Sequence, residues 1–109
     1  MAFRVASLSE VPPGSMRSFT VSGKEILVAN LNGRLYAMDS RCSHRNGDLS
    51  KGTLDGTVVT CPLHGSKFDL ATGKSISGPK LGQIKMKISD LKSYPVKVDE
   101  GSIMVDVPE

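Results

Sequence analysis

The sequence has few aromatic residues and few residues that bind soft metals. Its 109 residues include no Trp, three Phe, two Tyr, two Cys and two His, and its net charge is only +3. A nucleic-acid-binding chain usually combines a dense basic stripe with aromatic side chains that stack on bases, so this composition argues against nucleic-acid binding. No stretch approaches the roughly 18 apolar residues of a membrane span, and the first residues lack the apolar core of a signal peptide. We therefore expect a cytoplasmic protein with no membrane segment.

The length suits a single domain over residues 1–109, and the residue pattern favours strands. The segments KEILVANL and RLYAMDS flank Asn32-Gly33, two residues that tolerate the positive φ of a tight hairpin. A second turn is predicted at Asp55-Gly56. Near the C-terminus, apolar residues alternate with polar ones on both sides of a turn at 99–102: Tyr94, Val96, Val98, Ile103, Val105 and Val107. The repeated period of two predicts an all-β antiparallel sandwich or small barrel.

Helical signals are scarce. Residues 7–10 (SLSE) have the spacing of a capping box, but Pro12 and Pro13 stop any helix longer than about one turn. The segment 81–91 (LGQIKMKISDL) is ambiguous, because its apolar residues fit both a helical stripe and the alternation of a strand. We expect a strand or an irregular surface excursion there.

All four Cys and His residues fall within 23 residues, in two short motifs. RCSHRNGDLS at 41–50 contains Cys42-x-His44, and CPLHGSKFDL at 61–70 contains Cys61-x-x-His64. Both motifs are rich in turn residues, and the predicted strand TVVT leads directly into Cys61. Two such loops at one end of a β-fold can hold a metal between their tips, with the sheet supplying rigidity.

Four interpretations of these motifs are open. A disulfide between Cys42 and Cys61 is uncommon in the cytoplasm, and a pair of inert buried thiols leaves both Cys–His spacings unexplained. A zinc site fits the ligand set, but zinc fingers usually place both Cys before both His. A dinuclear iron–sulfur cluster accounts for the order, because two thiolates bind one iron and two imidazoles bind the other. Each loop then supplies one ligand to each iron.

The two motifs resemble the cluster-binding region of Rieske [2Fe–2S] proteins, in which C-x-H and C-x-x-H are separated by about 15 to 17 residues. The spacer at 45–60 falls within that range, and the flanks VPPG, SGP and YPVKV extend the resemblance over nearly the whole chain. The resemblance implies an antiparallel β-sandwich or barrel with a small cluster-binding subdomain of two loops at about residues 40–80. It also implies one [2Fe–2S] cluster, with four ligands: Cys42, His44, Cys61 and His64.

The histidine ligands should raise the reduction potential. With two thiolates and two neutral imidazoles, the oxidised site has no net charge, whereas four thiolates would make it a dianion. An electron enters a neutral site more easily, which places the family at roughly −150 to +300 mV against about −400 mV for all-Cys ferredoxins.

The resemblance further implies which residues surround the cluster: Gly47, Leu63, Gly65, Ser66 and Pro79. Gly47 and Leu63 occupy the positions of an extra cysteine pair found in high-potential respiratory relatives, so this chain lacks that disulfide. Ser66 matches a serine that donates a hydrogen bond to a cluster sulfur. Phe68 stands where those relatives have a Tyr donor, and we expect it to pack in the core. Fewer donors to the cluster predict a low to intermediate potential.

Ligand counting argues for a carrier rather than an enzyme. A Rieske-type oxygenase also needs a mononuclear iron held by two further His and a carboxylate, and no His remains after His44 and His64. The chain also lacks a G-x-G-x-x-G nucleotide motif. The resemblance implies a soluble one-electron carrier between a flavoprotein reductase and a terminal oxygenase or similar enzyme. The alternatives are a small electron-transfer subunit of a larger reductase, such as nitrite reductase, and a structural zinc module.

The basic excess of the chain is local: residues 67–92 hold six Lys against two Asp. The simpler interpretation is a solvated surface. The sharper one is a docking surface for an acidic redox partner, with Lys80, Lys85 and Lys87 as its candidate contacts.

Overall fold

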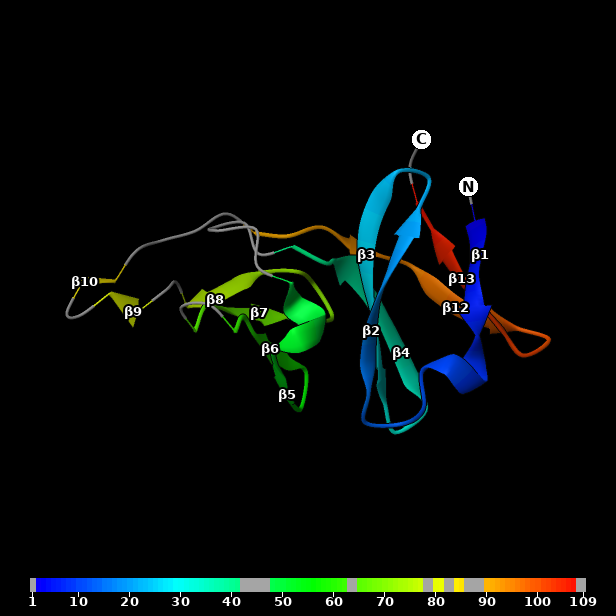
Figure 1. Ribbon diagram of the computed structural model, residues 1–109, viewed down its shortest axis with the longest axis horizontal. Helices are drawn as coiled ribbons and strands as arrows, with labels where there is room; N and C mark the ends of the chain where they lie inside the picture. Colours follow the sequence, from blue (N-terminus) through cyan, green and yellow to red (C-terminus); the bar gives the residue numbers. More distant parts are fainter. Residues whose placement is uncertain are drawn as a thin grey trace.

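The computed structural model describes residues 2–41, 48–62, 65–77, 80–81, 84–85 and 90–107. Its strands form three main antiparallel sheets and one short hairpin (Figure 1). The first sheet has the order β1 (Ala2–Ser7), β13 (Ser102–Asp106), β12 (Val96–Asp99). The second has the order β11 (Ser93–Tyr94), β4 (Arg34–Asp39), β3 (Lys24–Leu31), β2 (Met16–Val21). The third has the order β5 (Thr53–Asp55), β6 (Val58–Thr60), β7 (Lys67–Asp69), β8 (Ser75–Ser77). The predicted all-β antiparallel architecture is confirmed.

The predicted hairpins are present. Asn32 and Gly33 join β3 to β4 with φ of 56° and 96°, and Glu100 and Gly101 join β12 to β13 with φ of 50° and 78°. The turn expected at Asp55-Gly56 lies one residue later, because Asp55 still pairs with Val58 across β5 and β6. Local turn chemistry therefore specifies most of the strand connections.

The second sheet is buried on both faces, which explains the unbroken apolar run in β3. Ile26 and Val28 pack toward the first sheet, together with Ile103, Val105 and Val107 of the C-terminal segment. Leu27 and Ala29 point to the opposite face and pack against the third sheet. A strand covered on one side only alternates polar and apolar residues. Because both faces of β3 are covered, successive residues of this strand are apolar.

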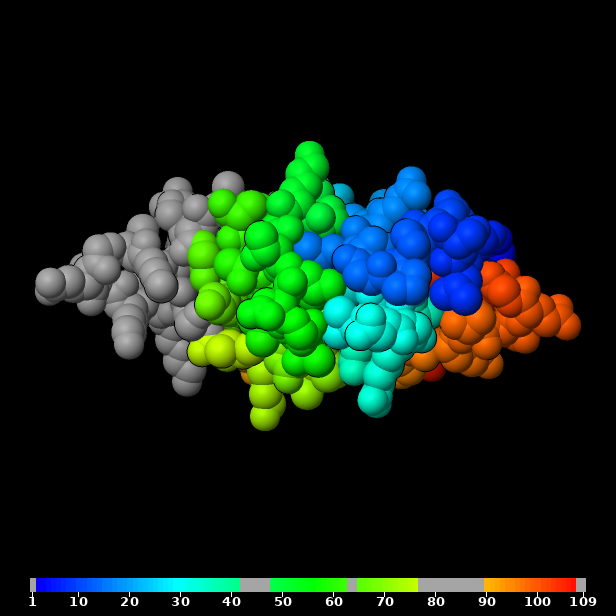
Figure 2. All heavy atoms as spheres, turned by 90° about the horizontal axis from the view of Figure 1, so that it is seen from below, coloured from blue at the N-terminus to red at the C-terminus, as the bar shows by residue number. Residues whose placement is uncertain are grey.

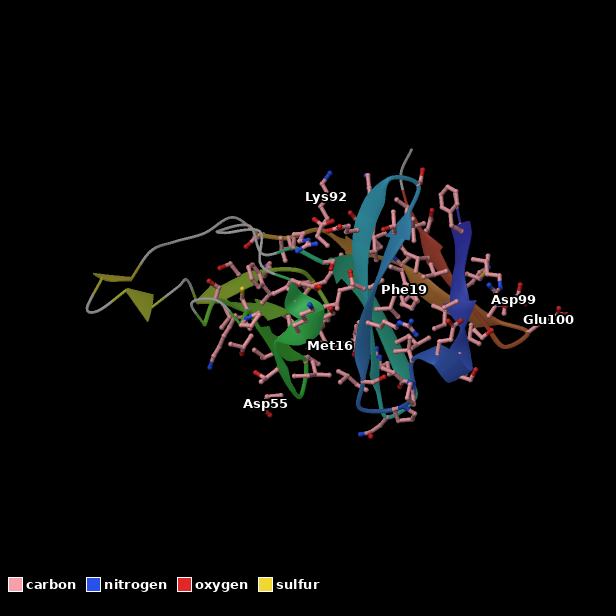
Figure 3. The ribbon with its side chains drawn as sticks, in the orientation of Figure 1. Met16, Phe19, Asp55, Lys92, Asp99 and Glu100 are labelled. Atoms are coloured by element: carbon pink, nitrogen blue, oxygen red, sulfur yellow. The ribbon has the colours of Figure 1, made fainter. Side chains whose placement is uncertain are left out.

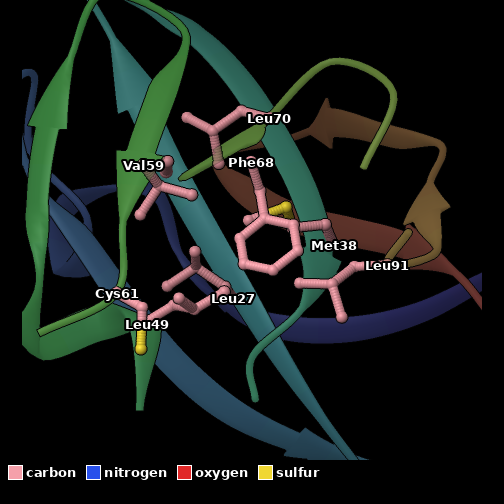
Figure 4. Packing of buried hydrophobic residues seen from close by; sticks show 9 residues of the cluster. Leu27, Met38, Leu49, Val59, Cys61, Phe68, Leu70 and Leu91 are labelled. Carbon is pink, nitrogen blue, oxygen red and sulfur yellow. The ribbon is translucent and has the colours of Figure 1, made fainter. Parts of the chain in front are cut away.

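One core lies between the first and second sheets, which together form a sandwich. A second core joins the third sheet to this sandwich. Its buried members come from both sides of the interface: Leu27, Ala29, Met38, Leu49, Val59, Cys61, Phe68, Leu70 and Leu91. Figure 4 shows the Phe68 ring beside Met38 and Leu91. At the rim of this core, Met16, Leu31 and Leu54 pack against it, and in Figure 2 the green third sheet lies against the cyan β3–β4 turn.

One strand departs from the simple alternation. Val98 was expected to point inward from β12, but 45% of it is exposed, whereas Ile103 across the same hairpin is fully buried. β12 is the edge strand of its sheet, and Val98 lies beside the turn at Glu100 and Gly101.

Helix is limited to two 3-10 turns among the described residues, η1 (Leu8–Glu10) and η2 (Leu49–Lys51). The capping box predicted at 7–10 forms, and the Ser7 N–H donates to Glu10 Oε2 at 2.8 Å. The described chain has no helix long and apolar enough to cross a membrane.

The segment 81–91 follows the strand alternative where it is described. β9 (Lys80–Leu81) and β10 (Ile84–Lys85) pair as a hairpin that projects beyond the third sheet (Figure 1). The stem is tied by the Leu91 N–H, which donates to the Gly73 carbonyl at 2.7 Å. The Ser75 N–H also donates to the Asp90 carboxylate at 2.8 Å.

Candidate metal centre

The structure describes one of the four predicted ligands, Cys61. Cys42, His44 and His64 lie outside the described residues, as do three of the residues expected around the cluster: Gly47, Leu63 and Pro79. Gly65 and Ser66 are described. The structure therefore shows the two frames that flank the predicted ligand segments: residues 40–41 with 48–52 on either side of 42–47, and residues 61 and 65–66 on either side of 63–64.

The first frame joins the residues on either side of segment 42–47. Arg41 and Asp48 form an antiparallel bridge, and the Leu49 N–H donates to the Ser40 carbonyl at 3.0 Å. Asp48 then caps η2, since its carboxylate accepts from the Ser50 hydroxyl at 2.6 Å and from the Ser50 N–H at 3.0 Å. These hydrogen bonds hold the pKa of Asp48 below its usual range.

An ion pair fixes the outer side of this frame. The Arg41 guanidinium donates to Glu25 on β3 through two nitrogens. This hydrogen bond lowers the pKa of Glu25 and raises that of Arg41. The pair is exposed to solvent, so its contribution is to orient the chain just before Cys42 rather than to add much stability.

The second frame is the loop that joins β6 to β7. The Cys61 N–H donates to the Ser66 carbonyl at 2.7 Å, and the Gly65 N–H donates back to the Cys61 carbonyl at 3.3 Å. Gly65 has a φ of 77°, a left-handed conformation that a side chain would strain. Cys61 therefore begins a short closed loop, with Ser66 at its other end.

Cys61 is nearly inaccessible to solvent and packs in the core that carries Leu49 of the first frame (Figure 4). The two frames thus meet in one apolar environment. Such surroundings exclude water and disfavour a bare thiolate charge, which coordination to iron would compensate.

Ser66 provides the test of whether a cluster fits. Its side chain is 1% exposed, and its Oγ is the buried side-chain polar atom for which the described chain offers no hydrogen-bond partner. An unsatisfied buried hydroxyl costs about 1–3 kcal/mol, so a native protein rarely leaves one without a purpose. A sulfide acceptor held between the two frames would satisfy it. The donor set and this hydroxyl therefore fit an iron–sulfur cluster.

Phe68 packs in the core, as expected. It is fully buried and faces Val59 and Met38 from the centre of β7. Its ring offers no donor to a cluster.

Two residues that anchor the chain near the site were not identified from the sequence: Asp48 and Asp39. Asp48 carries a recognisable signal, because Asp directly before a short helical turn is a frequent N-cap. Asp39 carries none, since its partners are distant in sequence. Its carboxylate accepts from the Tyr94 hydroxyl at 2.6 Å and from the Lys92 N–H at 3.0 Å, which anchors the returning chain beside the first frame.

Comparison with known proteins identifies the family of the chain. The description of the family whose model matches residues 1–95 is the Rieske [2Fe-2S] domain. The chain belongs to the Rieske [2Fe–2S] family. A single Rieske cluster is therefore its cofactor.

A Rieske relative of similar length is the ferredoxin component of the naphthalene 1,2-dioxygenase system of Pseudomonas aeruginosa. It is 35% identical over 101 residues, which cover 93% of this chain and 90% of the relative. A solved structure, the ferredoxin of carbazole 1,9a-dioxygenase from Nocardioides aromaticivorans IC177, has a TM-score of 0.79 at 31% identity and covers 96% of both chains.

A second structural relative is a chain in the complex of reduced oxygenase and oxidised ferredoxin in carbazole 1,9a-dioxygenase. Its TM-score is 0.81 at 32% identity, over 95% of this chain and 91% of that one. The whole Rieske fold of the present chain is thus shared with proteins that are themselves ferredoxins.

Proposed function

We propose that the protein is a one-electron carrier of a ring-hydroxylating dioxygenase system, receiving electrons from a flavoprotein reductase and delivering them to a terminal oxygenase. The observation that carries this proposal is the loop that Cys61 and Ser66 close, in a chain of the Rieske family: Cys61 is buried, and the described residues offer the buried Ser66 hydroxyl no hydrogen-bond partner. The relatives named as ferredoxin components support the choice of a carrier over a reductase subunit. We place its action in the cytoplasm.

In this proposal, Cys42 and Cys61 bind one iron, and His44 and His64 bind the other. The bound cluster would accept and release one electron reversibly, and the oxidised site would carry no net charge. The chain provides the environment: the core around Cys61 and Leu49 would exclude water from one side, and the Ser66 hydroxyl would donate a hydrogen bond toward a sulfur. Gly47, Leu63, Gly65 and Pro79 complete the surroundings.

The test begins with the purified protein. We expect two irons and two acid-labile sulfides per chain, and an EPR spectrum after reduction with an average g-value below that of all-Cys clusters. A colourless protein that contains zinc and no sulfide would establish the zinc module instead. Substituting Cys61→Ser should abolish the EPR signal.

The carrier role is tested by reconstitution. A cognate reductase and terminal oxygenase should form product only when this protein is added, and in proportion to it while it is limiting. Gel filtration of a native extract separates this role from that of a fixed subunit: a carrier elutes near its own mass of 11.6 kDa, whereas a subunit elutes with its large partner.

A further inference from the structure

The residue that follows η2 and the last residue of β6 meet at a point where the fold has no room for a side chain. Gly52 follows η2, and a Cβ built on it would lie 1.9 Å from the Thr60 carbonyl oxygen and 3.1 Å from the Thr60 carbonyl carbon. Its φ of −83° and ψ of −159° lie in an extended region open to other residues. Glycine is therefore required at this position for space and not for backbone conformation.

Each side of this contact leads within a few residues to a ligand segment. The Gly52 N–H donates to the Leu49 carbonyl at 3.0 Å, and the Leu49 N–H donates to the Ser40 carbonyl at 3.0 Å, across the base of segment 42–47. On the other side, Thr60 directly precedes Cys61, whose N–H closes the second loop. Both connections are made of hydrogen-bonded backbone, which transmits a displacement instead of absorbing it.

We propose that the contact between Gly52 and Thr60 sets the separation of the two ligand segments, and that Gly52 is a positioning residue for the cluster. This inference rests on the proposed cluster site. An alanine at 52 must move away from the Thr60 carbonyl by about 1 Å, because real Cβ contacts below 3.0 Å essentially do not occur. Metal–ligand distances tolerate only about 0.2 Å, so the two frames could no longer serve one cluster without distortion.

Gly73 offers a matched control for crowding in the same fold. A Cβ there would lie 2.1 Å from the Leu91 carbonyl oxygen, and its φ of 77° adds backbone strain. Gly73→Ala should therefore destabilise the protein at least as much as Gly52→Ala. However, its contact joins the turn between β7 and β8 to the stem of the β9–β10 excursion, and it does not link the two predicted ligand segments.

The experiment compares holoprotein of the wild type, Gly52→Ala and Gly73→Ala. We expect Gly52→Ala to lose its cluster to an iron chelator at least tenfold faster than Gly73→Ala and to show altered g-values after reduction. Gly73→Ala should keep the wild-type EPR spectrum despite a lower melting temperature. A Gly52→Ala protein with wild-type g-values and cluster lifetime, or equal effects of both substitutions, would overturn the inference.

If Gly52→Ala does not fold, hydrogen exchange of the wild-type protein tests the inference instead. The Gly52 and Cys61 amides lie on opposite sides of the contact, and a rigid joint requires them to open together in hydrogen exchange. Different opening free energies for these two amides would overturn the inference. A wild-type protein that carries zinc instead of iron and sulfide would refute the proposed function, whereas an intact wild-type cluster with an unaffected Gly52→Ala refutes only the positioning role.

Discussion

The Ser66 hydroxyl should tune the reduction potential. Reduction adds negative charge to the cluster, and a hydroxyl that donates to a sulfur stabilises the reduced form more than the oxidised form. Removing it by Ser66→Ala should lower the potential by roughly 60 mV, equivalent to about 1.4 kcal/mol for one electron. Protein-film voltammetry measures this shift.

Ser18→Ala is the matched control for Ser66→Ala. The Ser18 hydroxyl is bonded to Ser40, so its removal also deletes a partly buried hydrogen bond. This variant should lose some stability and keep the wild-type potential. Equal potentials for Ser66→Ala and the wild type would show that the Ser66 hydroxyl does not bond to the cluster.

Tyr94 should make stability depend on pH in alkaline solution. Burial, followed by its hydrogen bond to the Asp39 carboxylate, raises the pKa of Tyr94 above its usual value. Above about pH 10 the unfolded chain therefore releases this proton while the folded chain keeps it, and the free energy of unfolding falls as the pH rises. Tyr94→Phe should lose this component.

Urea unfolding of the holoprotein between about pH 9 and pH 11 tests this dependence. Tyr36→Phe is the control, because Asp39 accepts from Tyr94 and not from the second tyrosine. An equal slope in Tyr94→Phe and the wild type would mean that other groups cause the alkaline loss.

At the scale of the elements, local signals in the sequence predict the hairpins well. Asn32-Gly33 forms a two-residue turn because both residues accept positive φ, and the register of β3 and β4 follows from it. The contacts between distant segments could not be predicted, since no local preference encodes which carbonyl Gly52 meets or which strand Asp39 anchors. The Cys–His motif is equally local, so the sequence was enough to predict the type of cluster. The burial of Ser66 depends on contacts between distant segments and could be seen only in the structure.

The third sheet depends on one aromatic side chain. Phe68 is fully buried between β6 and the second sheet, so Phe68→Ala leaves a large cavity and should cost about 3–5 kcal/mol of unfolding free energy. Phe19→Ala, at a partly buried site on β2 (Figure 3), should cost well under half of that. Urea titrations of the two variants provide the comparison, and similar losses would contradict the central role of Phe68.

Across the whole molecule, charge is distributed unevenly. The lysine-rich segment 67–92 includes the projecting β9–β10 hairpin, while Asp99 and Glu100 occupy the tip of the β12–β13 hairpin at the opposite end (Figures 1 and 3). An acidic partner approaching this molecule would be steered toward the basic end, where Cys61 directly follows β6 of the third sheet.

Reversing charge within the lysine-rich segment 67–92 should slow delivery of electrons, although Lys87 itself lies outside the described residues. Lys85→Glu combined with Lys87→Glu should lower the rate of electron transfer to the oxygenase on the order of tenfold at low ionic strength, and added salt should remove the difference. Lys24→Glu combined with Lys97→Glu changes the net charge equally within the sandwich and should leave the rate near that of the wild type. Stopped-flow reoxidation of the reduced protein measures both. Because both double variants change the net charge by the same amount, equal slowing by the two would mean that overall charge, and not the location of Lys85 and Lys87 in the chain, governs encounter with the partner.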